Sequence, residues 1–154
     1  MSKPKQWSVR IYGQPAAQAR PRFAGGRSYR AGRSVQWEAD AAHTMAKEWE
    51  AAHGPPEGRD EPLSVSALAI FKRPGRMVWK RKPMVREIHH SKPDIDNVLK
   101  SILDGATLAG IIKDDALVHQ VHIVKFYAAG GEVPRVEITF NWGCITAPKE
   151  KEKT

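Results

Sequence analysis

The sequence predicts a small α+β domain in which helices pack on a mixed sheet, in the order β-α-β-α-β-β. Segments 7–12, 62–71, 117–127 and 136–142 show the apolar patterning of strands, and segments 34–53 and 94–109 show helical spacing. A chain of 154 residues with a hydrophobic fraction of 41% is long enough and apolar enough for one domain with a real core.

The first half of the chain is predicted to contain a strand, a helix and a second strand. Trp7, Val9 and Ile11 alternate with polar residues in a half-buried strand that ends at Gly13. The helix over 34–53 ends at Gly54-Pro55-Pro56. Its apolar stripe, with Glu38 and Asp40 off it, comprises Trp37, Ala41, Met45, Trp49 and Ala52. In the strand over 62–71, apolar residues near the end fall on both faces, which indicates cover on both sides.

The second half is predicted to contain a helix over 94–109 and two strands. The apolar face of the helix comprises Ile95, Val98, Leu99, Ile102, Leu103 and Ala106. Asp96, Lys100 and Asp104 are four apart and line a polar face. Gly130-Gly131 lies between the strands over 117–127 and 136–142, so we expect these two to form an antiparallel hairpin.

Four carboxylates are predicted to converge where this helix begins. Asp94 and Asp96 lie at its N-terminal end, and Asp114 and Asp115 lie in a turn before the next strand. Such carboxylates would repel one another unless a cation lay among them, which indicates a Mg²⁺ site. Asp94, Asp96 and Asp115 are the candidate ligands, with Mn²⁺ as an alternative ion, and Lys100 is placed to bind a phosphate.

Each of these residues also has a simpler interpretation. Asp94 is suited to cap the helix, and Lys100 to form an i,i+4 ion pair with Asp96. Asp114 and Asp115 would then be only a polar turn. The clustering of acids in a chain this basic favours the metal site over all three interpretations together.

The overall charge favours a polyanionic partner, either nucleic acid or an acidic membrane face. There are 25 Lys and Arg residues against 17 Asp and Glu, giving a formal net charge of +8 and a pI near 9.8. Two segments, 14–33 and 72–90, concentrate the basic residues beside aromatic ones, as nucleic-acid-binding loops do. The candidate DNA contacts are Arg20, Arg22, Lys80, Arg81 and Lys92, with Trp79 as a stacking platform. The alternatives are a solvated, mobile loop for 14–33 and, for 72–90, a solvated hairpin whose charge aids solubility.

Several classes of protein are disfavoured. Cys144 is the only cysteine, so an intrachain disulfide and a multi-cysteine zinc site are excluded. The N-terminus has no signal-peptide pattern, and no apolar run is long enough to span a membrane, so we expect a cytoplasmic protein. Residues 144–154 are charged and are predicted to form a disordered tail.

One stretch carries a family resemblance. The motif Lys92-Pro93-Asp94-Ile95-Asp96-Asn97-Val98-Leu99-Lys100, followed by Asp104, Gly110 and Lys113-Asp114-Asp115, closely resembles the signature of the RusA family of Holliday junction resolvases. The segment Gln18-Ala19-Arg20-Pro21-Arg22-Phe23 is similar to the arginine-containing first loop of that family. The resemblance extends from about Trp7 to Phe140, so residues 1–143 are expected to form the RusA-like domain.

The resemblance implies a Mg²⁺-dependent, homodimeric endonuclease that resolves four-way DNA junctions by paired symmetric nicks, in recombination and repair. Many members of the family are encoded by prophages. Asp94, Asp96 and Asp115 fall on its metal-binding catalytic aspartates and Lys100 on its catalytic lysine, with Asp114 and Asn97 as accessory residues. Pro93 stands where some members carry a basic residue, so Lys92 or the 72–90 segment would make that DNA contact. A two-fold dimer would match the near two-fold symmetry of a junction.

Two other functions remain open on the sequence. A non-catalytic nucleic-acid-binding protein explains the charge, although not the acidic cluster. A metal-dependent nuclease acting on a broader range of branched DNA explains both.

Overall fold

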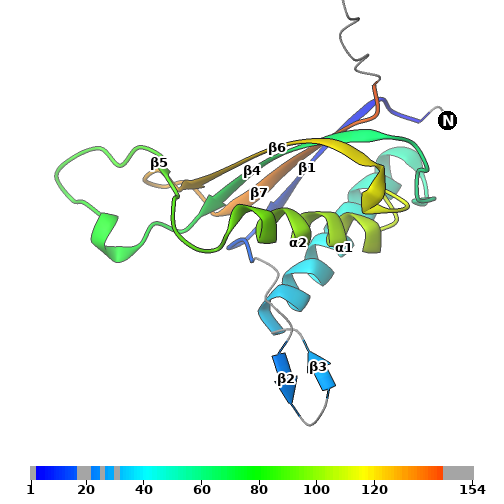
Figure 1. Cartoon of the computed structure of the whole chain (residues 1–154). Coiled ribbons are helices and arrows are strands. Elements are labelled where there is room, and N and C mark those ends of the chain that lie inside the picture. The colour runs from blue at the N-terminus through cyan, green and yellow to red at the C-terminus, as the bar shows by residue number, and fades with distance from the viewer. Residues whose placement is uncertain (1–2, 17–21, 25–26, 30–31, 144–154) are drawn as a thin grey trace, which may run out of the picture.

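The computed structural model of the chain describes residues 3–16, 22–24, 27–29 and 32–143. A five-stranded sheet has the order β1-β7-β4-β6-β5 and carries the helices α1 and α2 on one face (Figure 1). The predicted α+β class, with helices packed on a mixed sheet, is confirmed. Within the described residues, no helix has the length and apolar character needed to cross a membrane. The predicted tail over 144–154 lies outside the described residues.

The sheet is mixed because β4 (Leu63–Phe71) runs parallel to β6 (Val118–Tyr127) and antiparallel to β7 (Arg135–Asn141). Edge strand β1 (Gln6–Tyr12) pairs antiparallel with β7, and the short β5 (Glu87–Ile88) pairs antiparallel with β6. The strand over 62–71 is buried on both faces at its end, as predicted, since Ala69, Ile70 and Phe71 are all buried.

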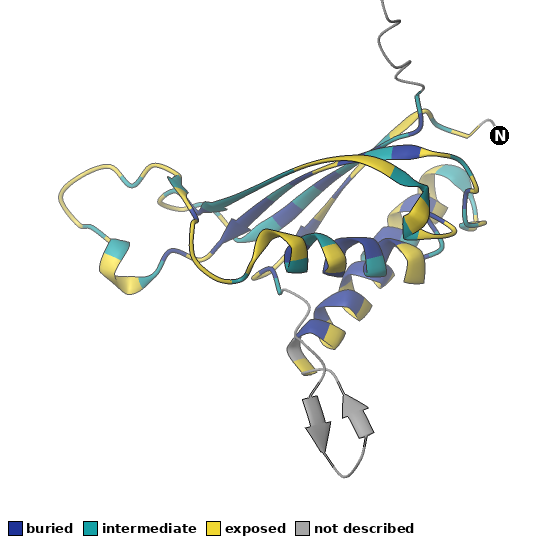
Figure 2. Cartoon of the chain, in the orientation of Figure 1, coloured by how far each residue is buried: buried dark blue, intermediate teal, exposed yellow. Residues whose placement is uncertain are grey.

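The core lies between the sheet and the helices (Figure 2). Alternate residues of the three central strands point toward the helices, including the register pairs Val65 with Phe140 and Ala67 with Ile138. Helix α1 (Gly32–His53) buries Trp37, Ala41, Met45 and Trp49, which confirms most of its predicted stripe. Ala52 is exposed instead, and Glu38, predicted to lie off the stripe, is 5% exposed, because the first turns of α1 are enclosed more widely than one stripe.

Helix α2 (Ile95–Leu108) packs against α1 along the face that the sequence predicts. Val98, Ile102, Leu103 and Ala106 are buried, whereas Leu99 is half-buried and Ile95 at the first turn is 42% exposed. Gly105 lets the helices approach closely, since a Cβ at that position would lie 3.3 Å from the Met45 side chain. The packed middle of α2 therefore holds its exposed N-terminal end in place.

The predicted hairpin between the last two strands is wrong. β6 and β7 are separated by β4, which pairs with both. The connection over 128–134 passes the end of β4, where the Ala128 N–H donates to the Phe71 carbonyl at 2.8 Å. Gly13 N–H then bonds the Pro134 carbonyl at 3.0 Å, which brings the chain to β1. A Gly-Gly pair in a longer connection permits a turn but does not specify which strands pair.

Two segments interpreted as loops contain additional strands. Within the 14–33 segment, β2 (Arg22–Ala24) and β3 (Arg27–Tyr29) pair as a two-stranded antiparallel ribbon. Within the 72–90 segment, a 3₁₀ turn at Gly75–Met77 precedes β5. This second segment, called the basic loop below, projects past the end of the sheet on the side where α2 begins (Figure 1).

Candidate active site

The first predicted site residue, Asp94, stands at the N-cap of α2. Its backbone carbonyl accepts hydrogen bonds from Asn97 N–H and Val98 N–H, both at 3.1 Å. Its side chain makes no capping hydrogen bond and is exposed, so the interpretation of this carboxylate as a helix cap is wrong. Asp96, in the first turn, is also exposed, and near a helix N-terminus a negative charge is favourable.

A lysine from β6 holds the turn that leads into Asp94. Lys125 Nζ donates to the carbonyls of Ser91 at 2.7 Å and Pro93 at 2.5 Å. Burial lowers the pKa of Lys125, and the nearby negative charge of Asp94 partly opposes that shift. Lys125 therefore links the start of α2 to the sheet. In the sequence, the signal for this role is that Lys125 interrupts the apolar run at the end of the 117–127 strand segment.

The polar face of α2 is confirmed at Lys100 and Asp104, and it reaches Asp115. Lys100 Nζ lies 3.6 Å from Asp104 Oδ1 and 3.3 Å from Asp115 Oδ2. The hydrogen bond to Asp115, followed by the charge of Asp104, raises the pKa of Lys100. The ion pairs of Lys100 thus join the helix to the turn beyond it, in place of the predicted local pair with Asp96.

The segment that leads into the turn at Asp115 is anchored to the fold. Gly110, at φ +77°, ends α2, and its carbonyl accepts from Gly58 N–H at 2.7 Å. Ile111 and Ile112 are buried, and Lys113 N–H bonds the Arg59 carbonyl at 3.1 Å. These contacts fix the chain direction just before the two aspartates.

Asp114 and Asp115 have different roles in this turn. The Asp114 carboxylate accepts a hydrogen bond from Ala116 N–H at 2.9 Å and so caps the short 3₁₀ helix Asp115–Leu117. That hydrogen bond, followed by one with Asp115, lowers the pKa of Asp114. Asp114 is therefore engaged by the fold, whereas Asp115 is half-exposed and faces Lys100.

The structure does not assemble the four predicted carboxylates into one ligand group. Across the described residues, which include all four, there is no group of three or more His, Cys, Asp or Glu side chains that could hold a metal ion. Lys100 supplies the positive charge beside Asp115 and Asp104. Repulsion among the acids therefore does not by itself require a metal, although exposed carboxylates remain the ligand type that Mg²⁺ accepts.

The basic loop is organised around a buried arginine. Arg73 is 7% exposed, and its guanidinium donates to the carbonyls of Met77, Val85 (2.7 Å) and Ala128 (3.1 Å). Trp79 is half-buried, with the Arg73 guanidinium carbon 4.5 Å and Lys82 Nζ 4.0 Å from its ring centre. In the sequence, the available signal was an arginine two residues after the end of an apolar strand. The predicted DNA contacts Lys80 and Arg81 are exposed on this loop.

Of the remaining predicted DNA contacts, Arg20 lies outside the described residues, and Arg22 is described only as part of the β2 backbone. Lys92 is exposed and lines a cavity of about 770 Å³ next to the start of α2, which the sequence did not reveal. Asn97, the accessory candidate, is half-buried in the first turn of α2.

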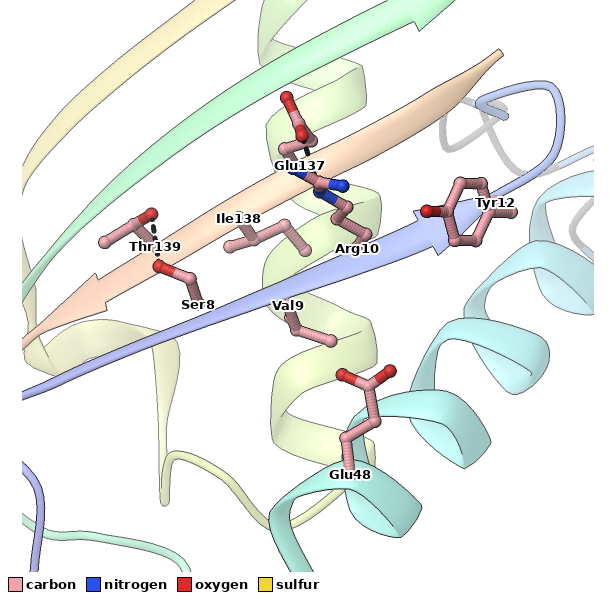
Figure 3. Close-up of a pocket in the computed structure, with 8 residues that line it drawn as sticks. All are labelled: Ser8, Val9, Arg10, Tyr12, Glu48, Glu137, Ile138 and Thr139. Atoms are coloured by element: carbon pink, nitrogen blue, oxygen red, sulfur yellow. Dashed lines mark hydrogen bonds and ion pairs between the residues drawn. The ribbon is translucent and has the colours of Figure 1, made fainter. Parts of the chain in front are cut away.

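A second hollow lies at the β1 edge of the sheet, and none of the predicted site residues line it (Figure 3). There, Arg10 Nε pairs with Glu137 Oε1 at 2.7 Å, and the hydroxyls of Ser8 and Thr139 share a hydrogen bond of 2.9 Å. These cross-strand pairs satisfy one another, so this hollow is a structural feature of the edge.

Comparison with known proteins connects the site to a family. The family model described as Endodeoxyribonuclease RusA matches residues 12–141. The crossover junction endodeoxyribonuclease RusA of Aquifex aeolicus (strain VF5) is 32% identical over 108 residues, which cover 70% of this chain and 69% of that protein. The match contains the N-terminal end of α2, the turn at Asp115 and the basic loop, and the chain belongs to the RusA family of endodeoxyribonucleases.

Proposed function

We propose that this protein is a Mg²⁺-dependent, structure-selective endodeoxyribonuclease that resolves four-way DNA junctions by paired symmetric nicks, acting in the cytoplasm in recombination and repair. The observation that carries the proposal is the family match over residues 12–141, which contains Asp94, Asp96, Lys100 and Asp115. The similar protein from Aquifex aeolicus is a crossover junction endodeoxyribonuclease, which supports the same substrate here.

The metal would be held by Asp94, Asp96 and Asp115, with Asp114 and Asn97 beside them. Their hard oxygen atoms on accessible side chains fit Mg²⁺, which commonly uses one or two carboxylates together with substrate phosphate and water. This mode of binding does not require three protein ligands assembled in advance, and no such group is present among the described residues. When bound, Mg²⁺ would neutralise charge on the phosphate and lower the pKa of an attacking water.

Lys100 would be the residue that changes partners when DNA binds. Its ammonium lies between Asp104 and Asp115 and is half-exposed, so it can reach a phosphate oxygen from its present position. A fixed cation there would stabilise the negative charge that builds on the phosphate in the transition state. The basic loop would position the DNA, since Lys80 and Arg81 are exposed while Arg73 holds the loop base.

We also propose a homodimer, because two symmetric nicks need two equivalent sites. The sheet face opposite the helices is open in Figure 1, and a partner could cover it. Ile88, which is 70% exposed, pairs in register with Phe126 on this face, and Leu68 lies nearby on β4. Sedimentation of the native chain and of Ile88→Lys tests this: a dimer that the substitution dissociates supports the interface, and a native monomer contradicts it.

The decisive experiment is cleavage of a labelled mobile four-way junction with and without Mg²⁺, mapped on all four strands. Paired nicks at symmetric positions that require the ion support the proposal. Equal cutting of fork, flap and junction substrates would favour a nuclease of broader branched-DNA specificity. Tight binding with no cutting in Mg²⁺ or Mn²⁺ would favour a non-catalytic binding protein. The Lys100–Asp115 ion pair is compatible with that alternative, because it gives Asp115 a positively charged partner without a metal.

A further inference from the structure

The cavity beside Lys92 lies between the end of β1, the first turns of α1 and the turn that enters α2. Its volume is about 770 Å³, and Lys92 and Pro93, which line it, lead directly into Asp94. A ligand held there would therefore be close along the chain to the first proposed metal ligand. The cavity has an aromatic side and a polar side, and each can be described from named contacts.

The aromatic side is built around His89. This imidazole is 6% exposed and stacks on Tyr127, with ring centres 4.2 Å apart and an interplanar angle of 23°. Phe71 lies against it at 4.6 Å. Burial, followed by the charge of Lys125, lowers the pKa of His89, which favours the neutral ring. Flat, uncharged rings fixed by their neighbours are suited to contact another flat ring.

The polar side has hydrogen-bonding atoms already oriented by the protein. Gln14 Oε1 accepts from Lys72 N–H at 2.7 Å, which leaves the Gln14 amide N–H groups as donors. Gln36 Nε2 donates to Asp40 Oδ1 at 2.9 Å, which leaves Gln36 Oε1 and the second Asp40 oxygen as acceptors. The lining therefore offers both donors and acceptors.

We propose that this cavity binds one unpaired nucleobase of the DNA, extruded from the stack next to the phosphate that is cut. A base has flat faces for the aromatic side and a mixed donor and acceptor edge for the polar side. Lys72 and Lys92 line the same cavity and match the charge of the flanking backbone. The inference rests on the proposed function, because it places the base beside the proposed catalytic aspartates.

The test uses a panel of four-way junctions, each with one abasic nucleotide near the branch point. Removing the base that enters the cavity should lower the cleavage rate by about tenfold, a usual effect for losing stacking and edge contacts. The variant with Gln36→Ala and Asp40→Ala together should show a much smaller loss at that same position. The control variant carries Lys47→Ala and Glu50→Ala, two exposed positions of α1 outside the cavity lining, and should keep the tenfold loss.

Two outcomes would overturn the inference while leaving the proposed function intact. One is a junction that is cut normally with every abasic position tolerated. The other is an abasic penalty of equal size in the cavity variant and the native protein. Thermal melting of each variant confirms that the compared proteins are folded.

A second measurement separates this inference from the proposed function if no junction is cut. A single-stranded oligonucleotide carrying 5-iododeoxyuridine is irradiated with the native protein, and cross-linked residues are identified by mass spectrometry. His89, Tyr127 and Trp37 all line the cavity, so cross-links at any of them support a base bound there. Cross-links confined to other residues contradict it, whatever the cleavage assay shows.

Discussion

The base of the basic loop and the start of α2 carry charge in opposite ways. At the loop base, the Arg73 guanidinium is buried and bonded to three backbone carbonyls, and Glu132 bonds Arg86 and Arg135. At the start of α2, Asp94 and Asp96 are exposed, and Asp94 leaves the helix uncapped by its side chain. The first region uses charge to hold the fold, and the second leaves charge available to a substrate or an ion.

The largest expected effect comes from the exposed acids. Asp94→Asn and Asp96→Asn should each lower the rate of junction cleavage by at least about 100-fold, because each removes a proposed metal ligand. Binding of the junction and the melting temperature should change little, since both side chains are exposed. Single-turnover cleavage and calorimetry measure the two quantities. An active Asp96→Asn variant would remove the aspartates from the catalytic mechanism.

Substitution of Arg73 should instead lower the stability of the fold. Arg73→Met keeps the length of the side chain but leaves the carbonyls of Val85 and Ala128 without their donor, which should cost about 2–4 kcal/mol of unfolding free energy. The control is Arg76→Met, an exposed position of the same loop, which should cost less than about 0.5 kcal/mol. Urea unfolding measures both. Equal stability of the two variants would show that the loop base is not held by Arg73.

The pH dependence of stability tests whether the charge of Glu132 also holds the base of the loop. Its hydrogen bond with Arg86, opposed by burial and aided by Ala129 N–H, lowers the pKa of Glu132 from 4.5 to about 2. A carboxyl with a depressed pKa stabilises the folded state above its unfolded pKa, and that contribution is lost as pH falls from about 4.5 toward 2.

Glu132→Gln should therefore destabilise the protein by about 1–2 kcal/mol at pH 7, with the difference from the native chain shrinking as pH falls below 4.5. Urea unfolding at a series of pH values measures this convergence. A difference that stays constant from pH 7 to pH 3 would show that the Glu132 charge does not contribute.

Asp114 lies next to Asp115 but belongs with the charges that hold the fold. Asp114→Ala removes the side chain that caps Asp115–Leu117 and should lower the melting temperature by about 2–4 °C. Asp114→Asn keeps an acceptor oxygen and should melt close to the native protein. A loss of cleavage in Asp114→Asn as large as that in Asp94→Asn would instead make Asp114 a ligand.

These contrasts also show what the sequence could and could not predict. Periodicity located β1, α1, β4, α2, β6 and β7, because burial of alternate or helically spaced residues is a local property of the chain. Periodicity could not predict the strand order, because the position of β4 between β6 and β7 depends on contacts between residues far apart in sequence. β5, with two residues, is too short to show any alternation.

The same limit applies to the site. The spacing of Asp96, Lys100 and Asp104 placed them on one helix face, but only the folded turn shows that Lys100 reaches Asp115. Whether a carboxylate is used as a cap also depends on its rotamer: of the two aspartates in cap positions, Asp114 caps its helix and Asp94 does not. The cavity beside Lys92 combines five separate segments and has no motif of its own.

The smallest expected effect concerns the exposed cations of the basic loop. Lys80→Gln and Arg81→Gln together should weaken binding to junctions of any sequence, because phosphate contacts do not read bases. The slope of log affinity against log salt should fall by about 0.9 for each contact removed. Lys113→Gln is the matched control, since its ammonium pairs with Asp60 at 3.2 Å, and it should leave the slope unchanged. An unchanged slope in the loop variant would mean that exposure alone does not make a cation a DNA contact, and that the segment near Lys92 must hold the backbone instead.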